Sequence, residues 1–187
     1  MIYSSIIHPY LTYGIEAWHG TFKNHTNKIF ILQKKAIRAI NNLDFNSHTN
    51  EYFILNQILK LEDQYRFQTS AYIFKLLNSN TDKEVLIELQ KNIRDHPHDT
   101  RNGEVLSVSR IIRSKSKNMI SHNGVKFWNS IPSNIRNSNS FYKFKNNVKS
   151  FFLININMII TIVRLTVRLV VFFFLTFLII FFFRFVS

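Results

Sequence analysis

The sequence predicts a mostly α-helical protein: a small helical bundle with a basic irregular loop and a hydrophobic C-terminal helix. Apolar residues recur at helical spacing over much of the first half of the chain. The 187 residues include only four Gly and three Pro, so a fold built from many tight turns is not expected. The sequence has no Cys, which excludes a disulfide framework, a Cys-based zinc site and a thiol nucleophile.

Charge and apolar composition divide the chain into zones. All 11 acidic residues lie between Glu16 and Glu104, where 12 Lys and Arg balance them. The remainder has 12 Lys and Arg and no acid, so it carries nearly all of the net charge of +13. An acidic soluble enzyme of average composition is therefore excluded. We predict a helical region over 1–93, a basic loop over 94–122, a helical element over 123–152 and a hydrophobic tail over 153–187.

The first helices are predicted from spacing and capping residues. Residues 1–13 are expected to be helical, with a bend or a new turn at His8-Pro9 because Pro lacks an amide hydrogen. After a connector over 20–24, Asn27 is expected to cap the next helix. The apolar stripe of that helix is predicted to be Ile29, Leu32, Ala36 and Ile40.

A continuous stripe then predicts a long helical segment from residue 52 onward. Its second half contains Leu61, Tyr65, Gln68, Tyr72 and Leu76, and Glu62 precedes Arg66 by four residues, the favourable order for a helical ion pair. Thr81 and Glu84 have capping-box spacing ahead of a further short helix. Order is predicted to resume over 123–129, with Val125 and Trp128 on one side. Pro132 then opens a short turn, and a last amphipathic face follows at Phe141, Phe144, Val148 and Phe152.

Four segments together resemble a known protein family. They are Ser5-Ile-Ile-His-Pro-Tyr-Leu-Thr-Tyr-Gly-Ile-Glu-Ala-Trp18, Leu32-Gln-Lys-Lys-Ala-Ile-Arg-Ala-Ile40, Ile58-Leu-Lys-Leu-Glu-Asp63, and Gly124-Val-Lys-Phe-Trp-Asn-Ser-Ile-Pro-Ser-Asn-Ile-Arg136 with Ser140-Phe-Tyr-Lys-Phe-Lys145. In this order they resemble the region C-terminal to the palm in reverse transcriptases of non-LTR (LINE-type, jockey-like) retrotransposons, over residues 2–153. His98-Asp-Thr-Arg101 also resembles the family's His-x-Tyr-x-Thr-Arg signature, with Asp99 and a compressed spacing as departures.

The resemblance implies a helical thumb over 1–93 and the connection beyond it, which in such enzymes hold template and primer. It does not imply polymerase activity, since the family's palm carries a Tyr-x-Asp-Asp box and this chain has no Asp-Asp pair. Two-metal chemistry needs paired carboxylates that bridge both ions. Glu62-Asp63 is the only adjacent acidic pair, and we expect it to form an exposed face paired with Arg66. The prediction is a catalytically incomplete fragment without a cofactor.

Other candidate sites are weaker. His96, His98 and Asp99 have metal-ligating groups, but Pro97 separates the two His and no further ligand follows at a recognisable spacing. We expect a loop with local hydrogen bonds there and no metal. Four aromatic residues could stack on bases, although core packing is the more common role at helical spacing. They are Trp18, Trp128, Phe141 and Phe144.

The basic residues are the better functional candidates. Clustered Lys and Arg without nearby acids attract phosphate, and counterion release would make such binding salt-dependent and independent of base sequence. The alternatives are a solvated basic face or one that meets anionic lipid. The predicted nucleic-acid-binding residues, for RNA or DNA, are Lys34, Lys35, Arg38, Arg101, Arg110, Arg113, Lys115, Lys117, Lys126, Lys143, Lys145 and Lys149.

The tail has the composition of a membrane segment. Thr176 is the only polar residue over 169–183, and a candidate transmembrane helix over 165–183 would include Arg168 near its end, where Arg can snorkel to the interface. The basic residues before it predict a single pass with a cytoplasmic N-terminus. The alternative protein class is therefore a small tail-anchored membrane protein with a basic cytosolic domain. If the tail is instead read-through of AT-rich sequence, the cytoplasm or the nucleus is expected.

Overall fold

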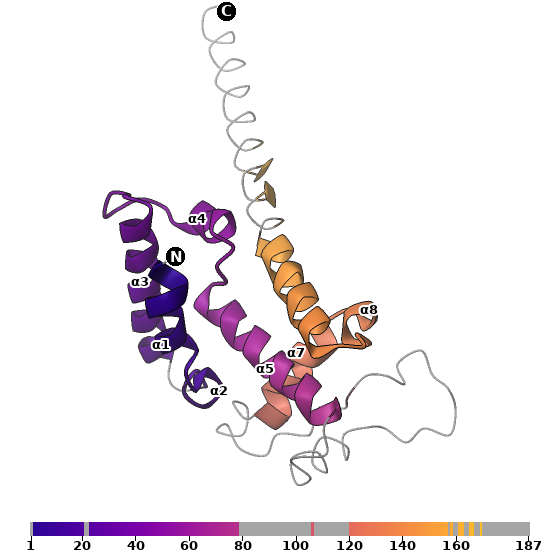
Figure 1. Cartoon of the computed structure of the whole chain (residues 1–187). Helices are drawn as coiled ribbons and strands as arrows, with labels where there is room; N and C mark the ends of the chain where they lie inside the picture. The colour runs from indigo at the N-terminus through magenta and orange to yellow at the C-terminus, as the bar shows by residue number, and fades with distance from the viewer. Residues whose placement is uncertain are drawn as a thin grey trace, which may run out of the picture.

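A computed structural model describes residues 2–20, 23–78, 106, 120–156, 158, 161–162, 165–166 and 169. The described part is mostly helical, which confirms the predicted fold class (Figure 1). The elements are η1 (Tyr3–Ile7), α1 (His8–Thr12), α2 (Ile15–Trp18), α3 (Lys23–Ile40), α4 (Asn50–Leu55), α5 (Leu61–Asn78), η3 (Ile120–Gly124), α7 (Val125–Ser130), α8 (Ser133–Arg136) and a helix over residues 141–156.

Residues 3–12 are helical, as the sequence predicts, in two elements that meet at His8. The π-helical turn η1 becomes the α-helix α1 at His8, next to Pro9, which has no amide hydrogen to donate. Gly14 then adopts a left-handed backbone with φ of 58°, a conformation that Gly reaches without a steric cost. The indole Nε1 of Trp18 donates to the Tyr13 carbonyl at 2.9 Å and holds this turn closed.

The predictions for α3 were wrong in two respects. The helix begins at Lys23, so Asn27 lies inside it and does not cap it. Leu32 is 60% exposed and Ile40 is 37% exposed, whereas Gln33 and Ile37 are buried. The face of α3 that packs against η1 and α5 contains Gln33 and Ile37, which follow Leu32 and Ala36 of the predicted stripe by one residue each. Because successive helical residues point about 100° apart, this shift turns Leu32 toward solvent.

The stripe predicted from residue 52 onward is divided between two helices. The chain turns between α4 and α5, where Gln57 has a left-handed backbone with φ of 52°. Leu61, Tyr65 and Leu76 are buried, as predicted. Helix α5 is buried around most of its surface because it contacts α1, α2, α3, α7 and η3, and it runs between α3 and the 141–156 helix (Figure 1).

The largest core lies between α5, α7 and the 141–156 helix. The rings of Phe74 and Phe144 stack with centroids 4.3 Å apart, and Trp128 packs 5.7 Å from Phe144. The predicted face of the last helix packs into this core: Phe144, Val148 and Phe152 are buried members and Phe141 is half-buried against them. Burial of Val125 and Trp128 is also confirmed. There are two smaller clusters. One joins η1, α3 and α4, and the other joins α2 to the start of α5.

Several sequence predictions fall on residues outside the described part. These are the short helix after Thr81, the triplet His96, His98 and Asp99, and most of the loop over 94–122. Of that loop, the structure describes Leu106 and residues 120–122, and residues 120–122 belong to η3. The candidate transmembrane helix over 165–183 is likewise outside it except at 165, 166 and 169. Within the described residues, no helix has the length and apolar character that crossing a bilayer requires.

Candidate nucleic-acid interface

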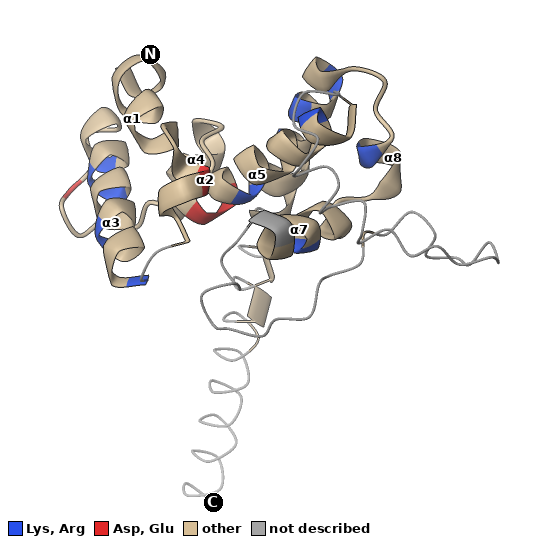
Figure 2. Cartoon of the chain, turned by 90° about the horizontal axis from the view of Figure 1, so that it is seen from below, with Lys and Arg blue, Asp and Glu red and all other residues tan. Residues whose placement is uncertain are grey.

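The predicted binding residues that the structure describes form two separate groups. Figure 2 shows Lys and Arg residues along α3 and, separately, on α7, α8 and the 141–156 helix, with acidic residues of α2 and the start of α5 between the two sets. The α3 group contains Lys34, Lys35 and Arg38. The second group, here called the C-terminal basic group, contains Lys126, Lys143, Lys145 and Lys149. Outside the described residues lie Arg101, Arg110, Arg113, Lys115 and Lys117.

The α3 group takes part in local structure. Arg38 Nε donates to the Ser47 carbonyl at 2.9 Å, so this side chain holds the segment between α3 and α4. Lys34 Nζ lies 4.9 Å from the centroid of the Phe30 ring, within the range of a cation–π contact. Lys34 and Arg38 are half-buried and Lys35 is exposed. Of the three side chains, Lys35 offers its charge to solvent most freely.

The C-terminal basic group has no acidic partner in the described part of the chain. The ion pairs among the described residues join Glu62 to His19 and Arg66, and Asp63 to Arg66. None of them involves these four lysines. Lys126, Lys143 and Lys149 are exposed. Lys145 is half-buried, with Nζ 5.9 Å from the Phe67 ring centroid and 5.5 Å from that of Phe141. Among the described residues, three of the four positive charges therefore have no acidic partner and are accessible.

The same lysines act on a histidine that the sequence did not single out. Burial lowers the pKa of His8 below its usual 6.5, and the positive charges of Lys149 and Lys145 lower it further. The 141–156 helix thus brings its cations to the N-terminal helix, far away in sequence. Burial and the nearby positive charges both disfavour the protonated imidazolium, so His8 is neutral at neutral pH.

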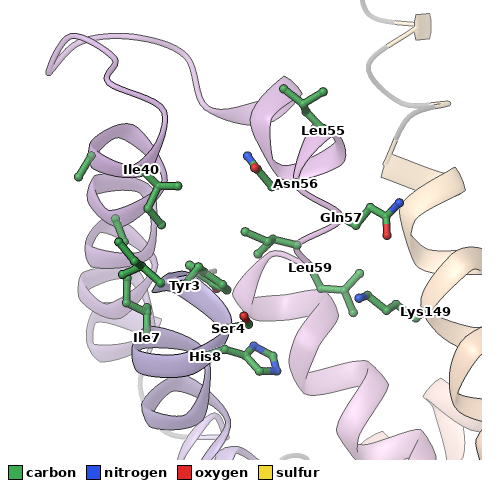
Figure 3. Close-up of a pocket in the computed structure, with 14 residues that line it drawn as sticks. Tyr3, Ser4, Ile7, His8, Ile40, Leu55, Asn56, Gln57, Leu59 and Lys149 are labelled. Carbon is green, nitrogen blue, oxygen red and sulfur yellow. The ribbon is translucent and has the colours of Figure 1, made fainter.

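Two hollows lie beside Lys149. A cavity of about 860 Å³ is bounded by η1, α3, the turn after α4 and Lys149, and its walls are mainly aliphatic, including Ile7, Ile40 and Leu59 (Figure 3). A second hollow of about 480 Å³ adjoins it, and Gln57 and Lys149 line both. No motif in the sequence indicates either hollow, because their walls come from segments far apart in the chain.

The acidic pair at the start of α5 is bound to neighbouring cations. Glu62 Oε1 lies 3.3 Å from Arg66 Nη2, which confirms the predicted helical ion pair. Glu62 Oε2 lies 3.3 Å from Nε2 of His19, whose ring stacks on Tyr65 at 4.2 Å. Asp63 is half-buried, and burial raises the pKa of its carboxyl while Arg66 and Lys60 oppose the rise. Within the described residues no three His, Asp or Glu side chains come together as a metal site would need.

Gln33 is a buried polar residue that the sequence analysis missed. Its Nε2 donates to Tyr3 Oη at 2.8 Å and to the Leu59 carbonyl at 2.9 Å, and its Oε1 accepts from the Leu61 amide at 3.0 Å. One side chain therefore joins η1, α3 and the first turn of α5. Nothing local to α3 marks this Gln, because its partners lie up to 30 residues away in the sequence.

Asn129 plays a comparable part at the other end. Its Nδ2 donates to the Leu106 carbonyl at 2.7 Å, and its Oδ1 accepts from the Leu106 amide at 3.2 Å. Leu106 is held in the core by this pair of hydrogen bonds. Trp128, the residue before it, is buried like Phe144, so both rings are core residues and offer no open face for a base. Trp18 and Phe141 are half-buried.

Comparison with known proteins gives one significant similarity. The chain is 30% identical over 115 residues to the RNA-directed DNA polymerase from mobile element jockey of Drosophila melanogaster. The match covers 54% of this chain and 12% of that polymerase, so the chain corresponds to a small part of its relative. No family model matches, and no solved structure does. The similarity supports a relationship to the retrotransposon reverse transcriptases that the sequence motifs resemble.

Proposed function

We propose that this chain is a catalytically incomplete fragment of a non-LTR retrotransposon reverse transcriptase, corresponding to the thumb and connection, and that it binds RNA or DNA. The observation that carries the proposal is the similarity to an RNA-directed DNA polymerase. The absence of an Asp-Asp pair from the sequence supports the lack of catalysis, since two-metal nucleotidyl transfer needs paired carboxylates.

The C-terminal basic group supplies the physical means of binding. Its lysines have no ion-pair partner among the described residues, and the sequence has no acid after Glu104. A polyanion that meets this surface releases counterions, so affinity falls steeply as salt rises and depends little on base sequence. The α3 group lies on a separate element, so it would add contacts only to a nucleic acid long enough to reach both groups (Figure 2).

The test is a binding titration of the full-length chain, kept in a non-ionic detergent because its tail is apolar. Fluorescent single-stranded and duplex DNA are titrated at about 50 mM and about 200 mM salt. We expect weaker binding at the higher salt, with each neutralised phosphate adding about 0.7 to 0.9 to the log–log slope. Absent or salt-independent binding would contradict the proposal.

Matched double variants locate the surface. Lys143→Gln/Lys149→Gln and Lys23→Gln/Lys28→Gln each remove two charges from exposed helical positions, the second pair from the start of α3. The first double variant is expected to lower the salt slope by up to about two phosphate equivalents and the second by less. Equal losses would show that net charge alone drives binding.

A separate assay examines catalysis. On a primed template with magnesium or manganese, the full-length chain is expected to incorporate no nucleotides. Template-dependent incorporation would overturn the proposal that the chain is catalytically incomplete.

A further inference from the structure

An exposed aromatic ring stands within the C-terminal basic group. Tyr142 is 75% exposed, although both of its neighbours in the aromatic cluster, Phe141 and Phe144, pack against the core. The sequence analysis named those two phenylalanines as candidates for base stacking and passed over Tyr142. An exposed tyrosine among lysines can stack on a flat group while the lysines attract negative charge, a combination that suits a nucleotide.

The residues around Tyr142 share its side of the helix. Asn146 and Lys149 follow at four and seven positions, which places them above Tyr142 on one face, and Lys143 flanks that face. The buried residues Phe144 and Val148 lie on the opposite side. Over two turns, about 10.5 Å, the outer face therefore presents an aromatic ring, an amide and two cations.

The outer face borders a hollow that a second element closes. Asn146, Lys149 and Ser150 form one wall of the hollow of about 480 Å³, and Ile54 and Gln57 form the other. Figure 3 shows the side chains of Gln57 and Lys149 in the space between α4 and the 141–156 helix. Gln57 is exposed and has a left-handed backbone, a conformation that favours Gly. The Gln57 side chain is therefore available to a ligand at the edge of the hollow.

We propose that this face binds single-stranded nucleic acid, with a base stacked on Tyr142, phosphates beside Lys143 and Lys149, and the amides of Asn146 and Gln57 toward the adjoining nucleotides. The inference rests on the proposed function and names the form of nucleic acid that the site takes. Only an unpaired base can lay its face on an exposed ring, because the bases of a duplex are stacked on one another. Side-chain amides can in turn pair with base edges.

The experiment compares single-stranded with duplex binding for matched tyrosine variants of the full-length chain in non-ionic detergent. Fluorescent oligothymidylate and a duplex of equal length are titrated at low salt with the wild type, Tyr142→Ala, Tyr142→Phe and Tyr10→Ala. Tyr10 is 82% exposed on α1, outside the 141–156 helix, and is the matched control for loss of an exposed ring. Circular dichroism is used to check that each variant remains helical.

Loss of the ring is expected to weaken single-strand binding selectively. Tyr142→Ala should raise the single-strand Kd about fivefold or more, the smaller end of the effect of removing a stacked base contact, and leave the duplex Kd within about twofold. Tyr142→Phe keeps a stacking ring and should retain affinity, and Tyr10→Ala should bind like the wild type. Gln57→Gly should weaken single-strand binding without lowering the melting temperature, because Gly tolerates the left-handed backbone.

The outcomes separate the two proposals. If Tyr142→Ala binds single strands like the wild type while Lys143→Gln/Lys149→Gln binds weakly, stacking is refuted and the proposed function stands. An equal loss for duplex and single strand refutes single-strand recognition. If the wild type binds neither nucleic acid at low salt, the proposed function itself fails. If Tyr142→Ala instead loses affinity for vesicles rich in anionic lipid and not for oligothymidylate, the face is a lipid surface.

Discussion

Replacing Gln33 with Leu tests whether a single polar side chain holds the N-terminal half together. Leu has nearly the same size as Gln, so the change removes hydrogen bonds while leaving little empty space. The wild-type amide satisfies Tyr3 Oη, the Leu59 carbonyl and the Leu61 amide, all in the interior. Leu61 is the first residue of α5, so its amide has no partner within the helix.

The expected cost follows from these three contacts. A buried hydrogen bond contributes about 1 kcal/mol net, and leaving a buried backbone group without a partner costs about 1 to 3 kcal/mol. Gln33→Leu leaves the Leu59 carbonyl, the Leu61 amide and the Tyr3 hydroxyl without this hydrogen-bond partner. We therefore expect a loss of about 3 kcal/mol in the free energy of unfolding. Tyr3→Phe removes one partner of the same amide and should cost about 1 kcal/mol.

The assay is urea unfolding followed by far-ultraviolet circular dichroism on the full-length chain in non-ionic detergent. Leu32→Ala changes the neighbouring residue on the exposed face of α3 and should shift the free energy by less than about 0.5 kcal/mol. In the double variant, the effect of Tyr3→Phe should largely disappear once Gln33 is Leu, because the shared bond is already lost. A Gln33→Leu variant as stable as the wild type would refute the reasoning.

Three further predictions concern other parts of the chain. Asn129→Leu removes both hydrogen bonds to Leu106 and should cost about 2 kcal/mol, with faster hydrogen exchange at the Leu106 amide. Lys149→Met should raise the pKa of His8 toward 6.5 in an NMR titration. Because the pKa of His8 is lower in the folded chain, the unfolded chain takes up the proton first as pH falls. The stability that His8 contributes above pH 6.5 is therefore lost as pH falls through the folded pKa, and the loss should be smaller in the variant. Phe144→Ala should cost about 3 to 5 kcal/mol in thermal or urea unfolding, because the ring is fully buried and stacked on Phe74.

The candidate site was only partly accessible from the sequence. The absence of acids after Glu104 predicts an excess of positive charge in the C-terminal part, because composition is a property of the chain itself. The predicted set of lysines and arginines nevertheless separated into two groups, since nothing local to α3 or the 141–156 helix says how far apart they lie (Figure 2). The choice between Phe141 and Tyr142 as the open aromatic ring depended on the side of the helix that meets α5.

Local pattern alone determined the helical class, the Glu62–Arg66 pair and the core face of the last helix, because each depends on residues within a few turns of one another. Tertiary structure decided which face of α3 is buried. The apolar stripe predicts that the face with Leu32 is buried. The three hydrogen bonds of Gln33 and the packing of Ile37 instead bury the adjacent face and leave Leu32 exposed to solvent. The partners of Gln33 are up to 30 residues away, and a buried amide is stable only where such partners converge.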